Sequence, residues 1–155
     1  MIQDVAVSLR VPQLEAQTTA AVLFADLSGF EALTEAVGDD AAADVAVRLV
    51  ALARASLATG AVLLKTLGDG VLVVTPDLAG AHETAERLRE LVRGEASMPA
   101  VRIGICEGPV VWRDGDVYGA TVNAAARAAD AAAPWEIRSG AQRAQVQEMG
   151  GLVGR

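Results

Sequence analysis

The sequence predicts a single α+β domain in which helices pack on a mostly antiparallel sheet. Short apolar runs that are typical of strands alternate with longer amphipathic stretches, in the order βααβ, βα, ββα, βα. Two of these runs flank a Gly-Asp-Gly turn, which is typical of an antiparallel hairpin. No repeat or low-complexity linker divides the 155 residues, so we expect one domain over 1–155.

The first half of the chain is expected to form a strand, two helices and a hairpin. The apolar run at 20–25 ends in Asp-Leu-Ser-Gly, which indicates a strand followed by a turn. Helices are expected over 31–37 and 40–58, because a glycine ends each one and the second repeats apolar residues at helical spacing. The hairpin strands are expected over 61–67 and 71–74.

The second half continues the alternation of helices and strands. The expected elements are a helix at 77–93, strands at 101–106 and 109–112 joined near Glu107-Gly108, a helix at 119–133, a strand at 135–139 and a helix at 142–149. The apolar stripe expected on the first of these helices is Leu78, Ala81, Ala85, Leu88 and Val92. The first seventeen residues show no clear period and are not assigned.

Composition and charge exclude several classes of protein. A net charge of −7 argues against a nucleic-acid partner, because affinity for phosphate backbones comes mainly from lysine and arginine. The single cysteine, Cys106, cannot form a disulfide within the chain. Neither a signal peptide nor an apolar run long enough to cross a bilayer is present. We therefore expect a cytoplasmic location and no membrane segment in this chain.

Two aspartates follow apolar runs that are expected to be strands. Asp26 comes just after the first run, and Asp69 lies at the tip of the Gly-Asp-Gly hairpin. If the two strands are neighbours, both carboxylates meet at one end of the sheet. Two hard oxygen ligands suit Mg²⁺, which takes one or two carboxylates together with water and substrate phosphates. The alternative is that each aspartate only caps the turn or helix that follows it.

Three further polar residues attract attention by their position. Lys65 is the only lysine among thirteen basic residues, and it precedes the Gly-Asp-Gly turn. Asn123 and Arg127 are four residues apart in an expected helix, so they share a face and could bind an oxyanion. The alternatives are chance retention of the lysine at a hairpin edge and an ordinary polar pair on a solvated helix face.

Four segments together resemble the class III nucleotidyl cyclase catalytic domain in order and spacing. They are residues 24–30 (FADLSGF), 65–70 (KTLGDG), 102–108 (RIGICEG) and 116–127 (DVYGATVNAAAR). The resemblance covers about residues 20–139 and implies a ferredoxin-like α+β core. It also implies a homodimer whose active sites form between the two subunits.

The resemblance implies a role for each matching residue. The metal ligands would be Asp26, Asp69 and Leu27, the base-reading pair Lys65 and Asp116, and the residues that steady the ribose and the charged transition state Asn123 and Arg127. The cofactors would be two Mg²⁺ or Mn²⁺ ions. Asp26 and Asp69 would come from one chain, and the other four polar residues from its partner.

The chemistry of Lys65 and Asp116 agrees with ATP as the substrate. Adenine presents an acceptor at N1 beside a donor at N6, and guanine presents the opposite pattern. An ammonium only donates and an ionised carboxylate only accepts, so the pair matches the adenine edge. The expected reaction is attack of the ribose 3′-oxygen on the α-phosphorus, assisted by two metal ions, with pyrophosphate leaving.

The sequence also departs from the family pattern. Glu31 replaces the usual threonine and could repel a nucleotide phosphate, and Cys106 replaces a common histidine. The C-terminal hairpin that supplies a lysine to the triphosphate is apparently absent, and only Arg143 and Arg155 lie in that region. We predict an adenylyl cyclase. The alternatives are a catalytically weak or silent cyclase-like regulatory module and an unrelated metal-dependent domain.

Overall fold

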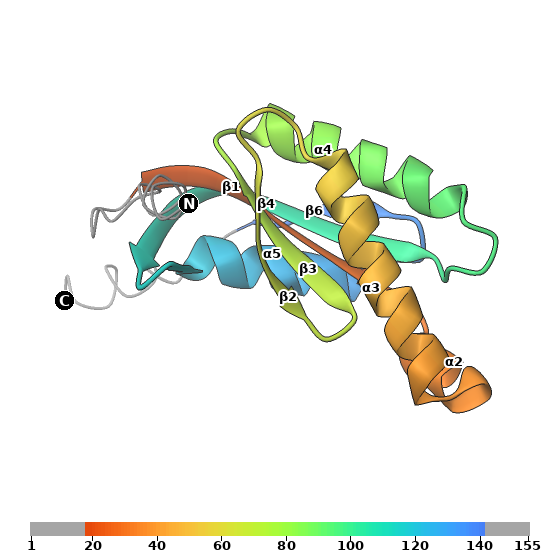
Figure 1. Ribbon diagram of the computed structural model, residues 1–155. Helices are drawn as coiled ribbons and strands as arrows, with labels where there is room; N and C mark the ends of the chain where they lie inside the picture. The colour runs from red at the N-terminus through yellow and green to blue at the C-terminus, as the bar shows by residue number, and fades with distance from the viewer. Residues whose placement is uncertain (1–17, 142–155) are drawn as a thin grey trace, which may run out of the picture.

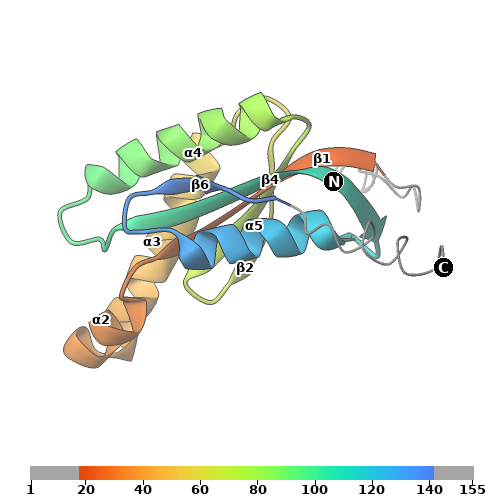
Figure 2. The ribbon, with the colours of Figure 1, turned by 180° about the vertical axis from the view of Figure 1, so that it is seen from behind.

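The computed structural model describes residues 18–141 as one six-stranded sheet with helices on both faces (Figures 1 and 2). The strands are β1 (Thr18–Leu27), β2 (Val62–Leu67), β3 (Gly70–Thr75), β4 (Val101–Arg113), β5 (Asp116–Tyr118) and β6 (Ile137–Ser139). The helices are α2 (Phe30–Val37), α3 (Asp39–Ser56), α4 (Leu78–Arg93) and α5 (Ala120–Ala131). This architecture confirms the predicted α+β fold class.

The strand order places β1 at the centre of the sheet. The order is β2-β3-β1-β4-β5, and β6 pairs with β4 as the one parallel neighbour among the described strands. β1 is antiparallel to both β3 and β4, and Asp26 lies opposite Gly70 on one side and Arg102 on the other. The expected convergence of the two aspartates is therefore confirmed, because Asp69 directly precedes Gly70 at the hairpin tip.

The two faces of the sheet support different helices. Side chains of a strand point alternately to the two faces, and in β1 the core under α3 and α4 takes Ala21, Leu23, Ala25 and Leu27. The core on the α5 side takes Ala20 and Val22. By the same alternation Asp26 lies on the α5 side. In Figure 1, α3 and α4 lie on one side of the strands, α5 lies on the other, and α2 extends beyond the sheet.

Helix α5 lies in direct contact with β4. Its buried residues are small, namely Thr121, Ala124, Ala125, Ala128 and Ala129. Opposite them Gly104 leaves no room for a side chain, since a Cβ atom there would overlap the α5 backbone at Ala125 and Ala129. The alanine-rich sequence of this helix thus serves close packing, and it leaves Asn123 and Arg127 on the exposed side.

Several boundaries differ from the sequence-based expectations. The two strands expected at 101–106 and 109–112 are one continuous strand, because β1 pairs with β4 through Glu107, Gly108 and Pro109 without a turn. The short strand β5 was not predicted. Leu78 is 37% exposed, so its assignment to the buried stripe of α4 was wrong. The helix expected at 142–149 lies outside the described residues.

None of the helices within residues 18–141 is long and apolar enough to span a membrane. The cytoplasmic location and the single domain over 1–155 stay predictions.

Candidate active site

The paired ends of β1, β3 and β4 form one side of an acidic pocket of about 650 Å³. The pocket is lined by Asp26, Leu27, Gly29, Phe30, Glu31, Thr34, Glu35, Asp69 and Arg102. Its size falls within the range of small-molecule sites. It therefore has room for a phosphate-bearing ligand between the strand ends and α2.

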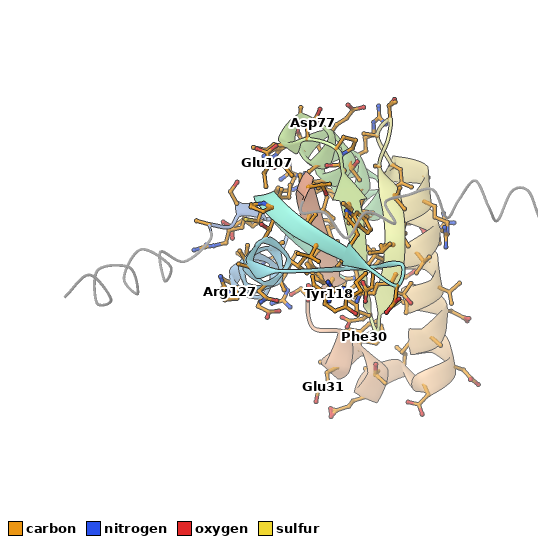
Figure 3. All side chains as sticks on the ribbon, turned by 90° about the vertical axis from the view of Figure 1, so that its left-hand side faces the viewer. Phe30, Glu31, Asp77, Glu107, Tyr118 and Arg127 are labelled. Carbon is orange, nitrogen blue, oxygen red and sulfur yellow. The ribbon has the colours of Figure 1, made fainter. Side chains whose placement is uncertain are left out.

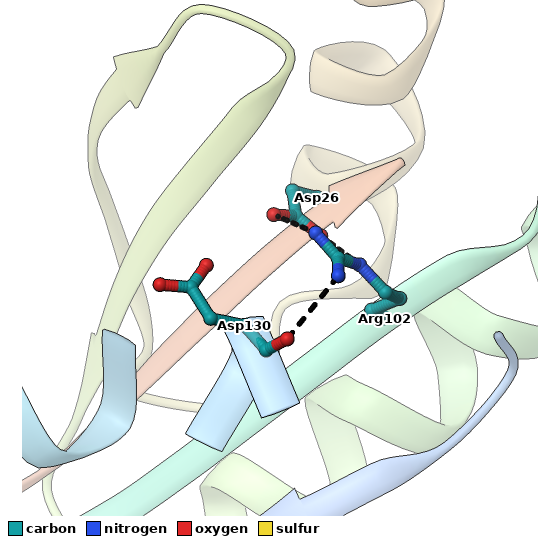
Figure 4. A network of polar contacts seen from close by, with 3 residues as sticks. All are labelled: Asp26, Arg102 and Asp130. Carbon is teal, nitrogen blue, oxygen red and sulfur yellow. Dashed lines mark hydrogen bonds and ion pairs between the residues drawn. The ribbon is translucent and has the colours of Figure 1, made fainter. Parts of the chain in front are cut away.

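Asp26 is bound by the guanidinium of Arg102, a residue that was not among the predicted site residues. Arg102 donates from Nε to Oδ1 and from Nη2 to Oδ2 of Asp26, both at 3.0 Å, and from Nη1 to the carbonyl of Asp130 at 3.3 Å (Figure 4). The two side chains are only 25–26% exposed. Burial raises the pKa of the Asp26 carboxyl above its ordinary value, and Arg102 offsets only part of that rise.

The donor set of the pocket fits a divalent cation with water and phosphate ligands. Asp69 lies near enough for its charge to raise the pKa of Asp26 further, so two carboxylates compete for positive charge in one place. Within residues 18–141 no group of three or more acidic, histidine or cysteine side chains is arranged to hold a metal ion. Two carboxylates are the kind of ligand that Mg²⁺ and Mn²⁺ take together with water and substrate phosphates.

Neither aspartate caps a helix. Helix α2 has Gly29 as its N-cap, in the left-handed conformation with φ of 69°, and no side chain caps it. Asp69 lies in the β2–β3 turn and precedes no helix. Leu27 is 2% exposed with its side chain in the core, so of its groups only the backbone could reach a metal ion.

Lys65 and Asp116, the two residues of the base-reading hypothesis, form an ion pair. The Lys65 Nζ atom donates to Asp116 Oδ2 at 2.9 Å, across 51 residues of sequence. Burial alone would raise the pKa of Asp116, but hydrogen bonds from Lys65 and from the backbone N–H of Val117 outweigh it and lower that pKa. The carboxyl is thus ionised at neutral pH, with Lys65 beside it.

The remaining two predicted residues lie on α5. Asn123 and Arg127 are both exposed on this helix, and neither lines the acidic pocket. Figure 3 shows Arg127 on α5 and Glu31 on α2, on different parts of the molecule. Lys65 and Asp116 do not line the pocket either. One chain thus carries the predicted metal ligands in one place and the other four predicted residues outside it.

Comparison with known proteins connects this geometry to a family. No protein-family model matches the chain. A pH-sensitive adenylate cyclase of Mycobacterium tuberculosis is 40% identical over 116 residues, which are 75% of this chain and 29% of that protein. The solved structure of an adenylate/guanylate cyclase/hydrolase from Silicibacter pomeroyi is 27% identical with a TM-score of 0.68, and the match covers 87% of this chain and 83% of that one. The chain belongs to the class III nucleotidyl cyclases.

A second solved structure supports the fold of this cyclase domain. The guanylyl cyclase domain of a fusion protein from the fungus Blastocladiella emersonii, described as a non-canonical dimer, has a TM-score of 0.68 at 20% identity, with 86% of each chain covered. The present cyclase domain spans less than a third of the length of the Mycobacterium tuberculosis relative.

Cys106 and Glu31, the two residues at which this cyclase domain departs from the family pattern, differ in their surroundings. Cys106 is buried, and burial raises the pKa of its thiol, so it is a core residue. Glu31 is exposed and lines the pocket one helical turn before Glu35, with which it adds negative charge beside Asp26 and Asp69. Arg143 and Arg155 lie outside the described residues.

Proposed function

We propose that this domain is an adenylyl cyclase that converts ATP to 3′,5′-cyclic AMP and pyrophosphate, as a homodimer with two Mg²⁺ or Mn²⁺ ions. The observation that carries the proposal is the division of the site within one chain. Asp26 and Asp69 share a pocket, whereas the Lys65–Asp116 pair and the exposed Asn123 and Arg127 lie outside it. A second copy that brings its α5, its β5 and the Lys65 side chain of its β2 to this pocket would complete the site.

Lys65 and Asp116 account for the choice of base. Each partner retains hydrogen-bonding capacity after forming the ion pair, because an ammonium has three donors and a carboxylate about four acceptor positions. Lys65 would donate to N1 of adenine and Asp116 would accept from N6. Guanine would put donor against donor and acceptor against acceptor, so ATP is the proposed substrate. The name of the Mycobacterium tuberculosis relative supports this choice.

The phosphates would lie in the acidic pocket, beside Arg102 and the start of α2. When bound, the two ions would orient the ribose 3′-oxygen and stabilise charge on the phosphates. Asp26 and Asp69 would hold those ions, and the backbone N–H groups at the start of α2, which no side chain caps, would donate to a phosphate oxygen. Arg102 lines the same pocket and has the planar fork that suits a phosphate.

The partner's α5 would supply the groups that act on the reacting atoms. Asn123 would hydrogen-bond the ribose and fix the direction of the 3′-oxygen. Arg127 would donate to the α-phosphate as negative charge develops there. Both lie on one exposed face of a helix that Gly104 allows to pack tightly, so their positions are fixed by the core and not by a loop.

One observation favours a second candidate, a cyclase-like module that binds nucleotide with little or no turnover. Glu31 and Glu35 place negative charge where the triphosphate would lie, and Arg102 occupies Asp26. An assay of the purified protein with ATP and with GTP, each with Mn²⁺, decides between the two. Cyclic AMP formation supports the enzyme, whereas nucleotide binding without either cyclic product supports the regulatory module.

A further inference from the structure

The ion pair between Arg102 and Asp26 occupies the carboxylate that the proposed function assigns to a metal ion. Both oxygens of Asp26 accept a hydrogen bond from the guanidinium, and the pair is three-quarters buried. A cation that binds Asp26 would therefore meet a fixed positive charge within hydrogen-bond distance of both of its ligand atoms. The divalent ion and the guanidinium thus compete for one carboxylate.

We propose that Arg102 is an exchangeable counter-ion that neutralises Asp26 until a divalent cation takes its place, and that the released guanidinium then serves the nucleotide phosphates. The inference rests on the proposed metal role of Asp26. It makes cation and nucleotide binding mutually dependent. Either ligand alone must break the Arg102–Asp26 pair without full compensation, whereas the two together satisfy both charges.

The surroundings of Arg102 support an exchange over simple loss of the contact. Its third hydrogen bond goes to the carbonyl of Asp130 at the end of α5, which can hold the side chain near the pocket after Asp26 is lost. The other charged groups that line the pocket are acidic, namely Glu31, Glu35 and Asp69. The guanidinium is the one basic side chain lining this pocket, so a bound phosphate would find its cationic partner there.

The energetics give the direction of the coupling. Removing one partner from a buried charge pair is costly, because it leaves the other charge uncompensated. A cation at Asp26 leaves Arg102 uncompensated until a phosphate arrives. Coupling between two ligands is reciprocal, so nucleotide must strengthen cation binding by the same factor by which the cation strengthens nucleotide binding.

Mn²⁺ binding without nucleotide tests the exchange directly. We would count free Mn²⁺ by electron paramagnetic resonance for the parent, Arg102→Lys and the control Arg48→Lys. Arg48 makes a similar two-point pair with Glu95, at 2.8 and 3.0 Å, but does not line the pocket. Both substitutions keep the charge and remove the fork, so a long-range field effect is held constant.

We expect Arg102→Lys to tighten Mn²⁺ binding by roughly fivefold or more, the lower end of common coupling factors, and Arg48→Lys to leave it unchanged. Binding of 3′-deoxy-ATP, which lacks the attacking hydroxyl, should become weaker in Arg102→Lys at saturating Mn²⁺. Unchanged or weaker Mn²⁺ binding in Arg102→Lys would overturn the proposal. Mn²⁺ binding that is the same in Asp26→Asn as in the parent would also overturn it.

A second experiment uses the unaltered protein, so its result does not depend on whether a variant folds. The Nε–H signal of Arg102 in a nitrogen–proton correlation spectrum should shift and exchange faster with water when Mg²⁺ is added, while the Nε–H signal of Arg48 stays constant. An Arg102 signal that does not respond to saturating Mg²⁺ would contradict the exchange. Neither experiment uses turnover, so an inactive protein would refute the proposed cyclase activity without deciding this inference.

Discussion

Lys65 is the only lysine of the chain, and its ammonium lies 2.9 Å from a carboxylate 51 residues away. The pair is more than a surface contact, because Asp116 also accepts from the N–H of Val117 and is thereby fixed in direction. Each group holds the other in place before a ligand arrives. We therefore expect the donor and acceptor directions of the pair to select adenine.

Replacing Lys65 by glutamate should lower the rate with ATP much more than it lowers Mn²⁺ binding. The substitution puts two carboxylates against the adenine edge, and an unmatched polar contact of that kind costs about 1–3 kcal/mol, or roughly ten- to a hundredfold in rate. Steady-state kinetics measures the effect, and Arg54→Glu on the exposed side of α3 controls for the change in charge. Equal turnover of ATP by Lys65→Glu and the parent would remove the base-reading role.

The lowered pKa of Asp116 predicts a pH dependence of stability. A carboxyl whose pKa is lower in the folded than in the unfolded state stabilises the fold above the unfolded pKa, and this stabilisation is lost as pH falls through the folded pKa. Asp116→Asn should therefore lower the free energy of unfolding at pH 7 by at most about 1 kcal/mol, because the pair is partly exposed. Urea unfolding should show this difference vanish in acid; a difference that persists there would refute the assignment.

Glu31 predicts weak binding of ATP that depends steeply on divalent metal. Its carboxylate lines the pocket at the start of α2, where the helix would otherwise favour an anion. Glu31→Thr and Glu31→Gln should both tighten the binding of 3′-deoxy-ATP in calorimetry. Glu86 is exposed on α4, and Glu86→Gln should have no effect. Tight binding by the parent without metal would mean that a different phosphate site exists.

At the scale of elements, the sequence predicted which segments are helices and strands better than it predicted their pairing. The hairpin and the helices follow from glycine positions and apolar spacing, which act locally. The strand β4 was divided wrongly at Glu107-Gly108-Pro109, because those residues favour a turn while ten residue pairs with β1 keep the chain extended.

The same reason explains why the role of Arg102 was missed. It meets Asp26 only because β4 lies beside β1 in the register that pairs these two residues, 76 positions apart. The six polar residues predicted for the site could be named from their motifs, whereas a contact set by strand order could not. The sequence offered one signal for this contact: Arg102 lies at the start of one expected strand, and Asp26 lies at the end of another.

The contact between β4 and α5 predicts a role for Gly104 in activity. Gly104→Ala would force α5 away from the sheet, and overpacking of this kind costs roughly 1–3 kcal/mol. Because α5 carries Asn123 and Arg127, the rate should fall even at temperatures where the variant is folded. Thermal unfolding and the rate are to be compared with Gly94→Ala, where a Cβ finds an ordinary contact of 3.4 Å. Unchanged stability and rate would show that α5 tolerates the displacement.

In the whole molecule, the predicted site residues fall into two groups that lie apart within one chain. Under the proposed function, the pocket with Asp26 and Asp69 would need basic groups to act on a triphosphate, and the exposed face of α5 would need a metal-bound substrate. A symmetric pair of chains can bring each half-site to its complement twice. We therefore expect the active site to be built from two subunits.

Mixing two inactive variants tests whether the active site forms between subunits. Asp26→Ala removes a proposed metal ligand and Asn123→Ala removes a proposed contact to the ribose, so each protein alone should make almost no cyclic AMP. After equal amounts are mixed and allowed to exchange subunits, activity should return to about a quarter of the parent's, because half of the dimers are mixed and each has one intact site. No recovery of activity, with mixed dimers shown to form, would contradict the account and place the site within one chain.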